Sequence, residues 1–124
     1  MTEPPLRIGL NCDVFPASDD PAVRRRCGVW LDYVDLLGSL GASPVLLPPA
    51  AASLAWLEEL DGVLLIGGDD YRAGNPAGEP ENFLAVDARR EEFDLAISRE
   101  VVTRDIPTLA ICGGFQLQVL VEGG

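Results

Sequence analysis

Residues 110–114 read AICGG and place a cysteine between an apolar run that predicts a strand and a segment, 115–121, that predicts a helix. Small residues stand two positions before and two positions after Cys112, as the sharp strand-to-helix turn of a nucleophile elbow requires. Such a turn lifts the reactive atom above the sheet, and the positive end of the helix dipole favours a thiolate. The pattern predicts nucleophilic chemistry at Cys112, with a buried structural thiol as the alternative.

A nucleophile that attacks a carbonyl group needs hydrogen-bond donors for the charge that develops on the carbonyl oxygen. The backbone N–H of Gly113, which follows the cysteine, is placed to be one donor. The second donor is expected from the loop at Gly67 and Gly68, because glycines let the backbone approach a ligand closely. A plain tight turn is the alternative explanation of these two glycines.

Four apolar runs predict the strands that must position these residues, and the amphipathic segments between them predict helices. The strands are expected at 6–11, 44–48, 63–66 and 107–111, and the helices at about 21–41, 53–60, 87–101 and 115–121. This alternation predicts an α/β fold, a parallel sheet flanked by helices. A ligand site in such a sheet lies beyond the carboxyl ends of the strands, where the candidates are residues 11–13, 67–70 and 112–114.

Side-chain spacing also predicts which residues face the core. In the helix expected from Pro21 onward, apolar residues step by three or four positions, which places Cys27 and Trp30 in the core. Trp56 is expected in the core for the same reason. The arginines at 24–26 are expected to face solvent.

The next long helix is predicted to begin after Asp87, whose side chain is placed to cap it. Phe93, Ile97 and Val101 recur every four residues and are expected to face inward. Asp94 is expected to face elsewhere, with the other charged residues of the helix.

The composition fits one folded domain over residues 1–124 and excludes several classes of function. The chain has 124 residues, of which 48% are hydrophobic, and a formal net charge of −11. Such an acidic chain would repel nucleic acids and anionic membranes, so neither is expected as a partner. Because the chain has no histidine and no lysine, it cannot by itself form a Ser-His-Asp triad, a histidine-ligated zinc site, a Walker loop or a Schiff base. No metal or other cofactor is expected.

The cysteines and the first residues predict a cytoplasmic location. Cys12, Cys27 and Cys112 are odd in number, lie far apart and form no CxxC pair, so reduced thiols are expected. The first residues carry neither a basic nor an apolar signal segment, and no apolar run approaches the ~20 residues of a membrane span.

Several segments together resemble the γ-glutamyl hydrolase branch of the class I glutamine amidotransferase-like enzymes. They are residues 41–48, 60–71, 87–93 and 107–117, and the resemblance runs in order from about Arg7 to Gly124. It implies a flavodoxin-like fold and a cysteine hydrolase that acts on the amide bond of γ-glutamyl compounds. By this resemblance, Cys112 is the nucleophile, Gly68 and Gly113 are the oxyanion donors, and Gly67 and Gln116 lie near the substrate. The elbow is also similar to that of amidotransferase domains that amidate corrinoids and cell-wall lipid intermediates.

The sequence departs from this family in length. Members are roughly twice as long, and their general-base histidine follows the nucleophile helix, whereas this sequence stops at Gly124 and has no histidine. The resemblance thus implies the N-terminal half of a hydrolase, with little or no turnover alone. A sheet that ends after its fourth strand leaves an apolar edge or face exposed. The expected partners are a γ-glutamyl small-molecule substrate and either a second copy or a complementary C-terminal half.

The residues leave other functions open. A catalytically silent binding or interaction module on the same fold would carry the same elbow without turnover. A phospho-receiver has a similar length and acidic strand ends, but it uses a lysine that this chain lacks. A redox-sensing thiol at Cys112 and a cation bound by Asp69 and Asp70 are further alternatives.

Overall fold

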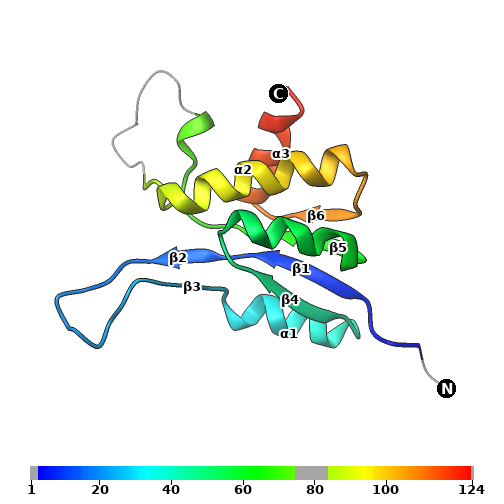
Figure 1. Ribbon diagram of the computed structural model, residues 1–124, viewed down its shortest axis with the longest axis horizontal. Helices are drawn as coiled ribbons and strands as arrows, with labels where there is room; N and C mark the ends of the chain where they lie inside the picture. Colours follow the sequence, from blue (N-terminus) through cyan, green and yellow to red (C-terminus); the bar gives the residue numbers. More distant parts are fainter. Residues whose placement is uncertain (1–2, 75–83, 124) are drawn as a thin grey trace.

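A four-stranded parallel sheet forms the centre of the molecule, and a computed structural model describes residues 3–74 and 84–123 of the chain. The strand order is β4-β1-β5-β6 (Figure 1). The strands are β1 (Arg7–Asn11), β4 (Ser43–Leu47), β5 (Gly62–Leu65) and β6 (Thr108–Ala110). The chain steps from β1 to β4 on one side and then to β5 on the other, so the order reverses between β1 and β5. The prediction of an α/β fold with a parallel sheet flanked by helices is confirmed.

The helices are divided unequally between the two faces of the sheet (Figure 1). Helix α1 (Leu31–Ser39) covers one face, while the 3-10 helix η1 (Ala51–Glu59) and helix α2 (Ala88–Thr103) cover the other. Helix α3 (Gly113–Val121) packs beside α2 and over the end of β6. Among the described residues, no helix is long and apolar enough to cross a membrane.

The face under η1 and α2, which we call the closed face, holds the larger core cluster. Its buried members come from β4, β5 and the two helices: Leu47, Leu57, Val63, Leu65, Phe93, Ile97 and Val101. Asp87 accepts a hydrogen bond from the N–H of Arg89 at 2.9 Å and so caps α2, as the sequence predicts. The cap and the inward stripe together explain why α2 begins and packs where it does.

The opposite face, which we call the open face, is covered by α1, and this cover does not extend to β6. Its buried cluster is Leu10, Leu37, Leu64 and Ile66. On β6, beyond the reach of α1, Leu109 is 62% exposed. A groove of about 720 Å³ runs along this face between α1 and β6, and its walls include Ile8, Leu64 and Leu109.

The predicted helix over 21–41 is wrong in its first half. The chain instead forms an antiparallel hairpin of β2 (Asp13–Phe15) and β3 (Arg26–Gly28), and α1 begins only at Leu31. Cys27 is therefore exposed on a strand rather than buried on a helix. Steps of three and four residues mimic a helix here, but pairing with β2 decides the local structure, as tertiary context often does.

The two tryptophans are also misplaced by the sequence pattern. Trp30 is 64% exposed and packs edge-on against Phe15 of the hairpin, with ring centroids 5.9 Å apart. Trp56 is 60% exposed on η1, because a 3-10 helix turns each residue further than an α-helix does and so changes which positions face the sheet. Neither ring belongs to the core.

Candidate active site at the carboxyl ends of the strands

Cys112 lies in the sharp turn between β6 and α3. The N–H of Ile111 donates to the carbonyl oxygen of Leu65 at 2.9 Å and extends the pairing with β5 up to the turn. Cys112 then adopts φ 48° and ψ −108°, a region that residues with a side chain rarely enter. Its thiol is exposed, and its carbonyl oxygen accepts the N–H of Gln116 at 3.0 Å, a hydrogen bond of the first turn of α3. This is the geometry that the elbow pattern predicts.

Gly114 makes the elbow possible because α3 approaches β5 so closely. A Cβ atom on Gly114 would lie 2.5 Å from the carbonyl oxygen and 2.8 Å from the Cβ of Leu65. No side chain fits there without moving the helix away from the sheet. The small residue two positions after the cysteine therefore has a steric cause.

The glycine loop after β5 lies against the elbow. A Cβ on Gly67 would be 3.3 Å from the Cβ of Cys112, and a Cβ on Gly113 would be 3.8 Å from the backbone nitrogen of Gly68. Among the described residues, neither the N–H of Gly68 nor that of Gly113 donates a hydrogen bond. The structure thus brings together Gly67, Gly68, Cys112 and Gly113, with two free backbone donors.

Gln116 stands one turn into α3 from Cys112, on the same side of the helix. It is exposed, and no hydrogen bond of its side chain occurs with the described residues. Its amide is therefore free to contact a molecule bound over Cys112.

The segment after β1 supports the site rather than presenting groups to a ligand. Oδ1 of Asn11 accepts the N–H of Ile66 at 2.8 Å and ties the ends of β1 and β5 together. Cys12 is 1% exposed, and burial, with the Cys27 thiol nearby, raises its pKa to about 12. Cys12 therefore stays protonated at neutral pH and is a poor nucleophile.

Asp69 and Asp70 follow the glycine loop at the surface. The backbone of Asp70 pairs with that of Leu84 and Val86, and its carboxylate accepts the N–H of Leu84 at 3.3 Å. Among residues 3–74 and 84–123, no three His, Cys, Asp or Glu side chains are grouped to hold a metal ion. Residues 75–83 of the long loop predicted here lie outside the described residues.

A buried charged network lies beneath the glycine loop. Arg90 and Asp94 are both fully buried, and Nε of Arg90 donates to Oδ2 of Asp94 at 2.9 Å. The hydroxyl of Tyr71 donates to the same carboxylate oxygen at 2.6 Å. Nη1 of Arg90 forms an ion pair with Asp13 at 2.8 Å, and Nη2 donates to the carbonyl oxygen of Gly67 at 3.1 Å.

Burial and neighbouring charges fix the ionisation of this network. Burial raises the pKa of Asp94, although bonds from Tyr71 and Arg90 oppose it. Burial also raises the pKa of Tyr71, which the Asp94 charge reinforces. Burial alone would lower the pKa of Arg90, but Tyr71, Asp94 and Asp13 together raise it above its ordinary value. Arg90 is therefore a permanent cation beneath the loop.

Comparison with known proteins decides the family. Residues 8–124 match the peptidase C26 family. The chain belongs to the peptidase C26 family. Within the class I glutamine amidotransferase-like proteins, this is the γ-glutamyl hydrolase branch that the sequence resembles.

Individual relatives agree with this assignment. A glutamine amidotransferase-like protein of Rickettsia prowazekii is 30% identical over 122 residues, which are 94% of this chain and 41% of that protein. The γ-glutamyl-γ-aminobutyrate hydrolase of Escherichia coli K12 is 32% identical over 96 residues, 74% of this chain and 38% of the relative. Protein NtpR of Enterococcus hirae is 29% identical over 96 residues, 74% of this chain and 40% of its own length. The chain thus spans about two fifths of the length of these relatives.

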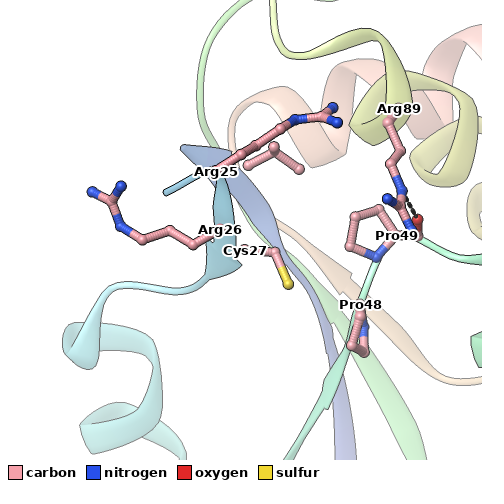
Figure 2. Close-up of a pocket in the computed structure, with 7 residues that line it drawn as sticks. Arg25, Arg26, Cys27, Pro48, Pro49 and Arg89 are labelled. Carbon is pink, nitrogen blue, oxygen red and sulfur yellow. Dashed lines mark hydrogen bonds between the residues drawn. The ribbon is translucent and has the colours of Figure 1, made fainter. Parts of the chain in front are cut away.

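This peptidase C26 chain also has a cavity of about 260 Å³ beside the hairpin, near the end of β4 (Figure 2). Arginines line it, and each of them already has a partner within the protein. Arg25 binds both carboxylate oxygens of Asp87 at 2.8 Å, and Nε of Arg89 donates to the carbonyl of Pro49 at 2.7 Å. Arg26 contacts backbone carbonyls and the Phe15 ring. Asp87 therefore compensates the charge of Arg25, while Arg26 and Arg89 are held by neutral carbonyl groups.

Sequence reasoning missed the buried network of this peptidase C26 chain. The expectation that Asp94 faces outward is wrong, because Arg90 neutralises it and Tyr71 hydrogen-bonds to it inside the protein. A signal was available. Arg90 and Asp94 lie four residues apart and continue the inward stripe of Ile97 and Val101 toward the start of α2. Opposite charges on an apolar stripe indicate a buried pair.

Proposed function

We propose that this chain carries the nucleophile of a thiol hydrolase that acts on the amide bond of γ-glutamyl compounds. The observation that supports this most directly is the strained, exposed Cys112 beside the free N–H groups of Gly68 and Gly113. The name of the E. coli relative, a γ-glutamyl-γ-aminobutyrate hydrolase, favours this substrate class.

The chemistry follows from these groups. The Cys112 thiolate attacks the γ-carbonyl carbon, and the Gly68 and Gly113 N–H groups bind the oxyanion of the tetrahedral intermediate. The C–N bond breaks, and the amine leaves after taking a proton. Water then attacks the thioester, which releases glutamate and restores the thiol. Gly67 and Gln116 line the place where the glutamyl group would sit.

The proton transfers need a general base that this chain does not contain, because it has no histidine. Losing one member of a catalytic triad costs on the order of 10⁴–10⁶ in kcat, and the base lies at the upper end. The isolated chain is therefore expected to form an acyl or alkyl adduct at Cys112 with little or no turnover.

The proposed partner is a complementary polypeptide that supplies the base and covers the open face. Two observations favour it: the relatives extend well beyond the matched region, and Leu109 lies exposed in an apolar groove. Self-association through the same groove is the alternative, and light scattering of the purified chain distinguishes the two. We also propose a cytoplasmic location, in keeping with three free thiols.

The test is covalent labelling with a chloroketone analogue of glutamine, followed by intact mass and peptide mapping. One adduct is expected, at Cys112, with Cys112→Ser losing it and Cys27→Ser keeping it, because Cys27 is exposed on the separate β2–β3 hairpin, whereas Cys112 lies against Gly67. Iodoacetamide, which lacks a glutamyl group, provides the reference reactivity of each thiol.

Two results would contradict parts of the proposal. Equal labelling of Cys27 and Cys112 by the analogue would leave only a silent binding or interaction module on this fold. Ordinary enzymatic turnover of a fluorogenic γ-glutamyl amide by the isolated chain would show that the base is not missing.

A further inference from the structure

We propose that Arg90 is a positioning residue, which holds the Gly67-Gly68 loop so that the Gly68 N–H is presented beside Cys112. This inference deepens the proposed function and rests on it for the role of that N–H. The physical claim, that Arg90 determines the place of the loop, can be tested separately.

Two contacts join Arg90 to the loop. Its Nη2 donates to the carbonyl oxygen of Gly67 at 3.1 Å, which fixes the peptide plane between Gly67 and Gly68. Its guanidinium also occupies the space that a Cβ on Gly68 would need. Because one plane carries both the Gly67 carbonyl and the Gly68 N–H, an arginine that binds the carbonyl orients the N–H away from itself.

Arg90 is itself held by three side chains, so it can act as a fixed support. Asp94 of α2 binds Nε at 2.9 Å, Asp13 of β2 lies 2.8 Å from Nη1, and the Tyr71 hydroxyl lies 3.5 Å from Nη2. The fork of a guanidinium can make these contacts at once, whereas an ammonium group cannot. Locked side chains of this kind keep a site in its productive geometry.

The same network reaches the other proposed donor. Oδ2 of Asp94 accepts both the Arg90 Nε–H and the Tyr71 hydroxyl, and the Tyr71 ring lies 3.3 Å from the position of a Cβ on Gly113. One buried carboxylate thus orders a residue under Gly68 and a residue beside Gly113. A buried ion pair is by itself weak support for stability, so its contacts with both donors favour a role in placing them.

The first experiment compares the ¹⁵N-labelled chain with Arg90→Lys by NMR. The matched control is Arg99→Lys, the same change at an exposed position of the same helix. In Arg90→Lys we expect the amide resonances of Gly67 and Gly68 to shift and the backbone at both residues to become less ordered. The amide resonances of β1 and β4 should keep their positions. Unchanged Gly67 and Gly68 amides in the folded variant would overturn the proposal.

The second experiment measures the rate of Cys112 labelling by the glutamine chloroketone relative to iodoacetamide. A misplaced catalytic group costs on the order of 10²-fold, and we expect this ratio to fall at least about tenfold in Arg90→Lys and to stay within about twofold in Arg99→Lys. A purely structural role would lower the unfolding temperature without changing the ratio in the folded protein, and this result would also overturn the proposal.

Tyr71→Phe provides a milder variant should Arg90→Lys fail to fold. It keeps the ring beside Gly113 and removes only the hydroxyl that orders Asp94, so the same two readouts are expected to change in the same direction by a smaller factor. If neither readout changes in Tyr71→Phe, the proposal fails. If the glutamine chloroketone shows no preference for Cys112 in the wild-type chain, the proposed function is contradicted. The NMR comparison would still test whether Arg90 determines the position of the loop.

Discussion

The two faces of the sheet differ in how completely they are covered. On the closed face, Val63 and Leu65 pack against Phe93 and Ile97, and all four side chains are at most 5% exposed. On the open face, Leu64 of β5 is buried, yet Leu109 on the adjacent strand is 62% exposed. Alternate residues of the sheet thus point either into the well-packed core of the closed face or toward the apolar groove of the open face.

The buried charged network that supports the candidate site lies on the closed face. Arg90, Asp94 and Tyr71 lie with α2 and α3, and Gly114 packs on the Leu65 backbone. The geometry at Cys112 is therefore assembled without any cover over β6 on the open face. Substitutions on the closed face should therefore alter stability and site geometry, whereas substitutions on the open face should alter association.

The largest change in unfolding free energy is expected from Ile97→Ala in the core of the closed face. Ile97 is fully buried, so its loss removes apolar contacts and leaves a cavity, which costs about 2–5 kcal/mol of unfolding free energy. Urea denaturation measures it. Val102→Ala, on the exposed side of the same helix, is the control and should cost under about 0.5 kcal/mol. Similar losses at both positions would mean that the closed face is no better packed than the surface.

A somewhat smaller effect is expected from Gly114→Ala. The new methyl group would meet the backbone of Leu65, so α3 must move, at a cost of about 1–3 kcal/mol. The matched control is Gly38→Ala in α1, where a Cβ meets no atom within 4 Å. This control should stabilise the protein by about 0.5–1 kcal/mol through helix propensity. Thermal unfolding of both variants tests the pair, and a neutral Gly114→Ala would contradict the close approach of α3.

The start of α2 gives a third, pH-dependent effect. Burial pushes the pKa of Asp87 upward, but the bonds from Arg25 and the Arg89 N–H together outweigh it and hold the pKa below its ordinary value. Because the folded pKa is lowered, the stabilisation is present above the unfolded pKa of about 3.9 and is lost as the pH falls through the folded value. Asp87→Ala should cost about 0.5–2 kcal/mol at pH 7, and this difference should vanish in acid.

Asp87→Asn separates the two contributions to that effect. An asparagine keeps the cap, since it also accepts the Arg89 N–H, but it loses the charge that binds Arg25. An exposed ion pair contributes about 0–1 kcal/mol, so this variant should lie between the wild type and Asp87→Ala in denaturation at pH 7. A loss that persists unchanged at low pH would show that the Asp87 charge is not its source.

The smallest change in stability is expected on the open face. Leu109→Ser should alter the unfolding free energy by under about 0.5 kcal/mol, because the side chain is already largely exposed. It should nevertheless weaken any concentration-dependent association measured by light scattering. A large loss of stability in dilute solution would show that Leu109 is covered in the free chain.

The sequence predicts most of the sheet because local signals and tertiary packing agree there. Every residue of Val63–Ile66 is apolar, as expected of a strand that is covered on both faces. The small residues around Cys112 likewise indicate a tight turn, and the close approach of Gly114 to Leu65 explains them. The cap at Asp87 is a local hydrogen bond and was predictable for the same reason.

The misses have non-local causes. The β2–β3 hairpin depends on pairing between residues 13–15 and 26–28, which the helix-like spacing of the same segment hides. Asp94 is expected on the surface with the other charged residues of α2. Its spacing from Arg90 signals the pair, but Tyr71 is recognisable as a further partner only once the elements have packed. The exposure of Leu109 likewise depends on where α1 ends relative to β6.

The backbone of Cys112 has a consequence for selection in the laboratory. A residue with a side chain held at φ 48° and ψ −108° stores about 1–3 kcal/mol, which a glycine would release. Cys112→Gly would thus remove the thiol and relax the fold in one step, so the variant without reactivity should survive heating better than its parent. A library screened for heat resistance alone would drift toward that variant, and only a screen for thiol reactivity would retain the cysteine.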